Sequence, residues 1–136
     1  MIDHEVKREI CATSVLFYKD KILLLFDQNY KHYVLPQGHT RKNEHPSETA
    51  IREVKEETGF TNLKLIKKLG QYQYHFCKDE KLIYKKIIVY LIEILNQKKV
   101  KKMVSQRENF INRFFLPTKA IEKLQWPQDK KQLEKL

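Results

Sequence analysis

The stretch GHTRKNEHPSETAIREVKEETGF, at residues 38–60, constrains the fold more than any other part of the chain. Its second half predicts an amphipathic helix over residues 46–58, because Pro46 suits the first helical turn and Gly59 suits the left-handed residue that ends a helix. His45 is a poor helix N-cap residue, so we expect a weakly capped start. A charged amphipathic helix therefore stands near the middle of the chain.

Three carboxylates crowd this predicted helix. Glu53, Glu56 and Glu57 stand three and four residues apart, and like charges at such spacings weaken a helix by about 0.2–0.5 kcal/mol each. Arg52 lies beside them and can orient a neighbouring acid, for which Glu44 is the candidate. Oxygen-rich clusters suit hard divalent cations such as Mg²⁺. Helical spacing alone leaves two interpretations open, a metal site and a solvated acidic face.

The rest of the chain predicts a sheet with helices around it. Runs of β-branched and large apolar residues predict strands at 10–18, 21–27, 33–36, 63–76, 81–95 and 110–117. Helices are expected at 118–124 and from Pro127 onward, while 37–45 and 96–107 read as polar loops. Strands before, between and after helices imply an α/β (α+β) fold, in which helices cover both faces of a mixed sheet.

Length and composition narrow the class of protein. The 136 residues suit one domain over 1–136. The chain lacks an apolar run long enough to span a bilayer and its start is charged, so we expect a cytoplasmic protein without a membrane partner. The net charge of +10 suits a phosphate-bearing substrate, although the lysines are scattered along the whole chain. Cys11 and Cys77 lack metal-ligand spacing, and both are expected to be buried.

The complete spacing of residues 38–60 resembles the box of the Nudix hydrolase family. The matching positions are Gly38, Glu44, Arg52, Glu53, Val54, Glu56, Glu57, Gly59 and Phe60. This resemblance implies a Nudix-type α/β/α sandwich with a mixed sheet. It also implies that the Gly38 carbonyl, Glu53, Glu56 and Glu57 hold Mg²⁺ (or Mn²⁺), with Glu44 and Arg52 as structural support. The implied reaction is hydrolysis of a nucleoside diphosphate linked to another group.

Outside the box, "LPQGH" and the layout of the C-terminal region resemble the asymmetrical dinucleoside tetraphosphate hydrolases. The resemblance implies that Glu108 is a further metal ligand or a catalytic base, a role that Glu53 could also fill. It implies that Tyr74 stacks on a base and that Lys86 and His39 contact phosphate. The ordinary alternatives are a solvated loop position for Glu108 and His39 and a core or edge-strand position for Tyr74.

Two departures from that subgroup keep other substrates open. Gln37 replaces the usual lysine and gives the "PQG" seen in RNA 5′-pyrophosphohydrolases, and the loop "TRKNE" lacks the common Pro-Gly. An RNA 5′ end is therefore the second candidate partner, followed by nucleoside triphosphates and ADP-ribose. A non-catalytic nucleotide-binding module would predict a broken box, and this box is intact. The leading prediction is hydrolysis of diadenosine tetraphosphate to ATP and AMP, with no obligate protein partner.

Overall fold

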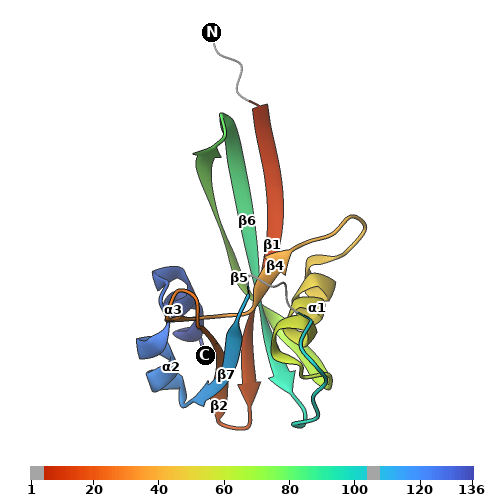
Figure 1. The fold of residues 1–136 in the computed structure, drawn as a ribbon, viewed down its shortest axis with the longest axis vertical. Helices are drawn as coiled ribbons and strands as arrows, with labels where there is room; N and C mark the ends of the chain where they lie inside the picture. The colour runs from red at the N-terminus through yellow and green to blue at the C-terminus, as the bar shows by residue number, and fades with distance from the viewer. Residues whose placement is uncertain (1–4, 104–107) are drawn as a thin grey trace.

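A computed structural model describes residues 5–103 and 108–136, and its centre is a seven-stranded mixed sheet (Figure 1). Its strands are β1 (Glu5–Tyr18), β2 (Lys21–Asp27), β3 (His32–Val34), β4 (Gln37–His39), β5 (Leu63–Lys78), β6 (Lys81–Ile94) and β7 (Phe110–Phe115). The order is β3-β2-β1-β6-β5, with β4 paired to β1 and β7 paired to β2. Only the β1–β6 pair among these is parallel, which confirms the predicted mixed sheet.

Three helices cover the two faces of this sheet: α1 (Pro46–Thr58), α2 (Pro117–Lys123) and α3 (Pro127–Leu133). Successive side chains of a strand point to opposite faces. Leu23 and Leu25 of β2 accordingly join one buried core with residues of α1, whereas Ile22 and Leu24 join the other core with residues of α2 and α3. The two cores on either side of the sheet confirm the predicted α/β/α sandwich.

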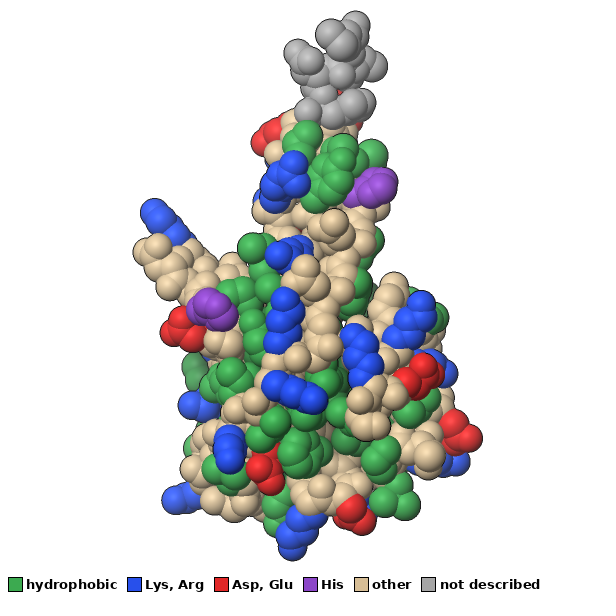
Figure 2. Space-filling model, turned by 180° about the vertical axis from the view of Figure 1, so that it is seen from behind, with side chains coloured by type: hydrophobic (Ala, Val, Ile, Leu, Met, Phe, Trp, Pro, Cys, Tyr) green, Lys and Arg blue, Asp and Glu red, His purple; other side chains and the backbone are tan. Residues whose placement is uncertain are grey.

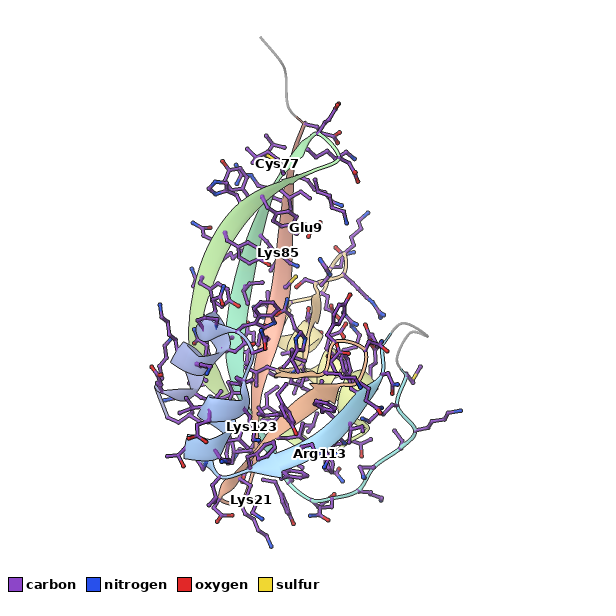
Figure 3. All side chains as sticks on the ribbon, turned by 60° about the vertical axis from the view of Figure 1, so that its left-hand side comes forward. Glu9, Lys21, Cys77, Lys85, Arg113 and Lys123 are labelled. Carbon is purple, nitrogen blue, oxygen red and sulfur yellow. The ribbon has the colours of Figure 1, made fainter. Side chains whose placement is uncertain are left out.

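Besides the weak cap expected at His45, two sequence-based expectations about local structure are wrong. Residues 37–39 of the predicted polar loop form β4, whose Gly38 pairs with Ala12 of β1. Three polar or small residues give no strand pattern, and only the neighbouring strand induces this one. Cys77 is exposed, whereas Cys11 is buried as expected. Cys77 lies near the tip of the β5–β6 hairpin (Figure 3), beyond the cover of the helices. Residues 104–107 of the predicted loop at 96–107 lie outside the described residues.

The start of α1 is better capped than its sequence suggests. The Nδ1 atom of His45 accepts a hydrogen bond from the Ser47 N–H at 3.1 Å, and the His45 N–H donates to Glu48 Oε1 at 3.0 Å. Together these form a capping box, with an imidazole nitrogen in place of the usual hydroxyl or carboxylate oxygen. At the other end Gly59 adopts a φ of 86° and ends the helix as predicted. The carboxylate-bearing helix is therefore fixed at both ends.

Part of the sheet extends beyond the helices as an arm, made of residues 5–10, 73–78 and 81–86 (Figure 1). Asp79 and Glu80, both with positive φ, make the two-residue turn at its tip. On the face shown in Figure 2, lysine and arginine side chains are spread over arm and body rather than gathered in one patch. None of the helices in the described part of the chain is long and apolar enough to cross a membrane.

Candidate functional site

A cavity of about 590 Å³ lies between β4 and α1, and we call it the glutamate pocket. Its walls carry seven of the candidate site residues singled out in the sequence: Gly38, His39, Arg52, Glu53, Glu56, Glu57 and Glu108. Five of them are positions of the box, His39 follows Gly38, and Glu108 enters from the segment before β7. The structure thus brings the distal acid and the helix acids to one place. A larger hollow of about 640 Å³ along the outer side of α1 contains neither Glu53 nor Glu57.

The helix positions its acids by burying its apolar stripe. Ala50 and Val54 are fully buried against the sheet, which leaves Glu53 half-buried and turns Glu57 inward to 4% exposure. Gly38 lies directly against this helix, because a Cβ atom built there would overlap the Glu53 carboxyl group. Only glycine lets the β4 backbone approach the acid so closely. The close approach places the Gly38 carbonyl and the helix carboxylates in one pocket.

Arg52 organises the outer edge of the glutamate pocket. Its Nε donates to Glu44 Oε2 at 2.8 Å, and its Nη1 donates to Glu53 Oε1 at 2.6 Å. Its Nη2 donates to the His39 carbonyl at 3.0 Å. The hydrogen bond from Arg52 is the main reason that the pKa of Glu44 falls to about 2. Glu44 therefore stays ionised and holds Arg52, which in turn fixes one oxygen of Glu53.

Glu57 is the most buried acid of the pocket. Its Oε1 accepts a hydrogen bond from the Gln37 N–H at 3.0 Å, and no ion pair to it forms among the described residues. Burial raises its pKa to about 9, and the nearby charges of Glu53, Glu108 and Glu56 add to the rise. Burial also raises the pKa of Glu53, against the opposing effect of Arg52. Among the described residues, Glu57 therefore lies in the interior of the pocket without a basic ion-pair partner, whereas Arg52 and Arg41 at the edge pair with Glu53 and Glu56.

The chemistry of this donor set fits a hard divalent cation. In the orientation described, no three His, Cys, Asp or Glu side chains among residues 5–103 and 108–136 converge closely enough to hold an ion, and one oxygen of Glu53 is bound to Arg52. The available ligands are carboxylate and carbonyl oxygens, which Mg²⁺ and Mn²⁺ prefer. A cation would also offset the repulsion that raises the pKa of Glu57.

A second cavity, of about 360 Å³, lies between β5 and the start of α3, and we call it the aromatic pocket. Its walls are Gln37, Tyr72, Tyr74, Trp126, Gln128 and Asp129. The Tyr74 ring is 41% exposed and lies nearly parallel to that of Tyr72, with 6.5 Å between centroids and 20° between planes. Gln37 lines both cavities, so the aromatic pocket adjoins the glutamate pocket.

The structure separates the two residues expected to contact phosphate. His39 lines the glutamate pocket, and its Nε2 lies 3.0 Å from Glu9 Oε2, a hydrogen bond that lowers the pKa of Glu9. Lys86 lies in the arm between Ile10 of β1 and Gln73 of β5. It is not among the residues that line either cavity. The role of Lys86 therefore stays a prediction without a supporting contact.

Sequence reasoning missed the α3 side of the aromatic pocket. Asp129, Gln132 and Leu133 are all buried and form one face of α3, although two of the three are polar. In the sequence, only Leu133, four residues after Asp129, indicates that this face of the helix packs inward. Asp129 was missed because it stands next to Lys130 and Lys131, where an acid is typical of an exposed helix surface.

Comparison with known families settles the family of this chain. The model of the NUDIX domain matches residues 8–136. The chain belongs to the NUDIX domain family. The predicted family is thereby confirmed, and the glutamate pocket is the place where the Nudix box meets the rest of the fold.

Individual relatives agree with this assignment. A Lactococcus lactis protein described as "Probable DHNTP pyrophosphohydrolase" is 38% identical over 63 residues, which are 46% of this chain and 36% of that protein. The match thus spans about a third of the relative's length.

Two solved structures share the Nudix fold of this chain. A C. elegans Ap4A hydrolase in a binary complex has a TM-score of 0.72 at 22% identity, with 93% of each chain covered. An E. coli dihydroneopterin triphosphate pyrophosphohydrolase also has a TM-score of 0.72, at 14% identity and with 97% of each chain covered. At such identities the likeness concerns the fold alone.

Proposed function

We propose that this chain is a single-domain cytoplasmic Nudix pyrophosphohydrolase that cleaves a phosphoanhydride bond in a nucleotide polyphosphate. The observation that carries the proposal is the glutamate pocket, where the box acids and Glu108 meet around the buried Glu57. Family membership and the fold shared with two hydrolases support it. Burial of several acids in one pocket costs stability, and such a cost is retained where the acids serve a charged ligand.

The Gly38 carbonyl, Glu53, Glu56 and Glu57 would hold Mg²⁺ or Mn²⁺, with Glu108 as an auxiliary ligand or base. When bound, such an ion neutralises charge that develops on the phosphate oxygens and lowers the pKa of the attacking water. The pocket is otherwise acidic and would repel a polyphosphate. Binding of the polyphosphate chain in this pocket is therefore expected to depend on the ion.

The chain's own groups have distinct tasks in this proposal. Arg52, held by Glu44, keeps one oxygen of Glu53 in place at 2.6 Å. Glu53 or Glu108 accepts the proton of the attacking water, because both line the pocket. Arg41, whose Nη2 lies 3.7 Å from Glu56 Oε1, is exposed on the rim and can attract phosphate.

The substrate that we propose is a dinucleoside tetraphosphate, cleaved with one water to a nucleoside triphosphate and a monophosphate. Three features support this choice: the sequence "LPQGH", the position of Tyr74 in the aromatic pocket, and the adjacency of that pocket to the glutamate pocket through Gln37. A base on the tyrosine side and phosphates on the acid side suit a nucleotide that spans both cavities.

A triphosphate substrate is the second candidate. It is favoured by the relative described as a DHNTP pyrophosphohydrolase. An RNA 5′ end would be a triphosphate of this kind, and Gln37 is the residue that suggested it. Neither candidate requires a protein partner.

A substrate panel tests the proposal. Purified protein with Mg²⁺ is offered diadenosine tetraphosphate, dihydroneopterin triphosphate, nucleoside triphosphates, ADP-ribose and 5′-triphosphorylated RNA. We expect the highest kcat/KM for diadenosine tetraphosphate, with ATP and AMP as products, and loss of activity in excess EDTA. Undiminished turnover in EDTA would contradict the metal site. A far higher kcat/KM for a triphosphate would replace the tetraphosphate assignment.

A further inference from the structure

Asp129 is an isolated acid in the wall of the aromatic pocket. It is 5% exposed, and its carboxyl group has neither a hydrogen bond nor an ion pair among the described residues. Its backbone N–H, in contrast, is satisfied by the Trp126 carbonyl at 3.1 Å. A buried polar group without a partner costs free energy comparable to a lost hydrogen bond. A ligand in this cavity would remove that cost.

The shape and composition of the cavity indicate what kind of ligand fits. Tyr72 and Tyr74 project from β5, and Trp126 precedes α3, so aromatic rings contribute much of the wall. A volume of about 360 Å³ lies in the range of small-ligand sites. Aromatic rings with a few polar groups between them favour a planar heterocycle, whose faces stack and whose edge forms hydrogen bonds.

The environment also fixes the hydrogen-bonding character of Asp129. Burial alone raises its pKa to about 7, so at and below neutral pH it is largely a carboxylic acid. The titratable groups that line the cavity with it are Tyr72 and Tyr74, and burial is the main reason that the pKa of Tyr72 is raised, so that Tyr72 stays a neutral phenol. Gln37 and Gln128 add only uncharged amides. A neutral carboxyl group offers one O–H donor beside one C=O acceptor.

We propose that Asp129 is the residue that selects adenine in the aromatic pocket, where the proposed function already places a base of the substrate. The carboxylic O–H donates to ring nitrogen N1, and the C=O accepts from the exocyclic N6 amino group. This pairing rests on the proposed function, because Gln37 joins the pocket to the glutamate pocket, where the phosphates would lie. An ionised carboxylate would instead need two donors, as on the N1–H and N2 amino edge of guanine.

The first experiment measures binding without catalysis. Trp126 is the only tryptophan of the chain, so its fluorescence reports on this pocket. AMP is titrated at pH 6.5 in EDTA. We expect quenching in the wild type and in Asp129→Asn, because an amide also offers one donor beside one acceptor. In Asp129→Leu we expect affinity to fall by about 10- to 100-fold, the effect of leaving a hydrogen-bonding edge unpaired. Equal affinity in all three proteins would overturn the proposal.

The second experiment uses pH to distinguish hydrogen bonding between Asp129 and the base from simple packing of the side chain against the base. The kcat/KM for diadenosine tetraphosphate is measured between pH 6 and 9 in the wild type and in Asp129→Asn. We expect the ratio of wild type to variant to fall about tenfold per pH unit above pH 7, because only the wild type loses the O–H donor. A ratio that stays constant across this range would contradict pairing through the neutral acid. Diguanosine tetraphosphate, which also suits the ionised form, should not show this fall.

Matched controls keep the result interpretable. Glu134→Gln removes an exposed acid at the end of the same helix and should change neither binding nor the pH profile. Circular dichroism verifies that each variant is folded, and Asp129→Asn preserves the side-chain shape if Asp129→Leu does not fold. If diadenosine tetraphosphate is hydrolysed and no substitution at Asp129 changes its kcat/KM, the role of Asp129 is refuted and the proposed function stands. Asp129-dependent binding of AMP without any such hydrolysis would refute the proposed substrate and leave the adenine pocket standing.

Discussion

The glutamate pocket and the aromatic pocket each bury one acid, yet they create different chemistry. Glu57 lies among Glu53, Glu56 and Glu108, and both burial and like charge raise its pKa to about 9. Asp129 lies among aromatic rings, and burial alone raises its pKa to about 7. A cluster of buried acids is relieved by a cation, whereas a single buried acid is relieved by a proton and a hydrogen-bonding partner.

This difference assigns separate tasks to the two pockets. Changes in the glutamate pocket should act on the chemical step, and therefore on kcat. Changes in the aromatic pocket should act on ground-state binding, and therefore on KM. Gln37 is the residue that the two cavities share.

The largest effect is expected for Glu57→Gln. Removing the charge of the most buried acid should lower kcat on the order of 10⁴-fold, since a bound metal contributes several kcal/mol of transition-state stabilisation. The metal-free variant should gain stability at pH 7, because a neutral amide carries no penalty for ionisation in the pocket. Steady-state kinetics measure the loss of kcat, and thermal unfolding in EDTA measures the gain in stability.

Glu122→Gln, which breaks only a surface ion pair with Lys119, is the control. If Glu57→Gln had the kcat of the wild type, Glu57 would have no part in the chemical step and the helix glutamates would be an ordinary acidic face.

Glu108→Gln should come next. If Glu108 is the base, kcat should fall by about 10²–10⁴-fold with little change in KM. Its exposed position suggests a small effect on stability. Kinetics in parallel with nucleotide binding would check this. A loss under about threefold would make Glu108 a bystander and leave Glu53 as the base.

Asp129→Asn tests the energetic side of the comparison. The pKa of Asp129 is about 7 in the folded state against an ordinary value of 3.8, so the native state binds more protons than the unfolded state between these two pH values. The Asp129 carboxyl group therefore contributes most to the free energy of unfolding below about pH 4. This contribution is lost as the pH rises to about 7, and it stays constant above pH 7. Because the amide does not titrate, the free energy of unfolding of Asp129→Asn should rise relative to that of the wild type by about 2–4 kcal/mol between pH 4 and pH 7. Denaturant unfolding at pH 4.5 and pH 8 measures the gain, and an equal difference at both values would contradict it.

Tyr74→Leu should have the smallest of these effects. Stacking on a base contributes about 1–3 kcal/mol, so KM should rise about 5- to 100-fold while kcat is retained. Tyr84, a strand tyrosine of the arm that is 37% exposed and lines neither cavity, provides the matched control Tyr84→Leu. A loss of kcat without a change in KM would show that the two pockets do not divide binding from chemistry.

The sequence by itself determined the helix, the long strands and the identity of the box. Pro46 and Gly59 bound α1 through their own backbone preferences, which act over one or two residues. The alternation of residues 87–89 in the sequence places Ile87 and Val89 on one face of a strand and Ile88 on the other, and the two cores divide them in the same way. Such features are local, so a linear pattern suffices to reveal them. The spacing of the glutamates belongs to the same class, because helical geometry fixes their mutual positions.

Tertiary structure alone decided which distant residues meet. β4 exists because β1 offers it a partner. Asp129 reads as a surface charge until α3 packs its face against the sheet and removes that carboxyl from water. Burial and long-range contacts are properties of the packed chain. The pKa of an acid, and thus its chemistry, follows from what surrounds it after folding rather than from its neighbours in sequence.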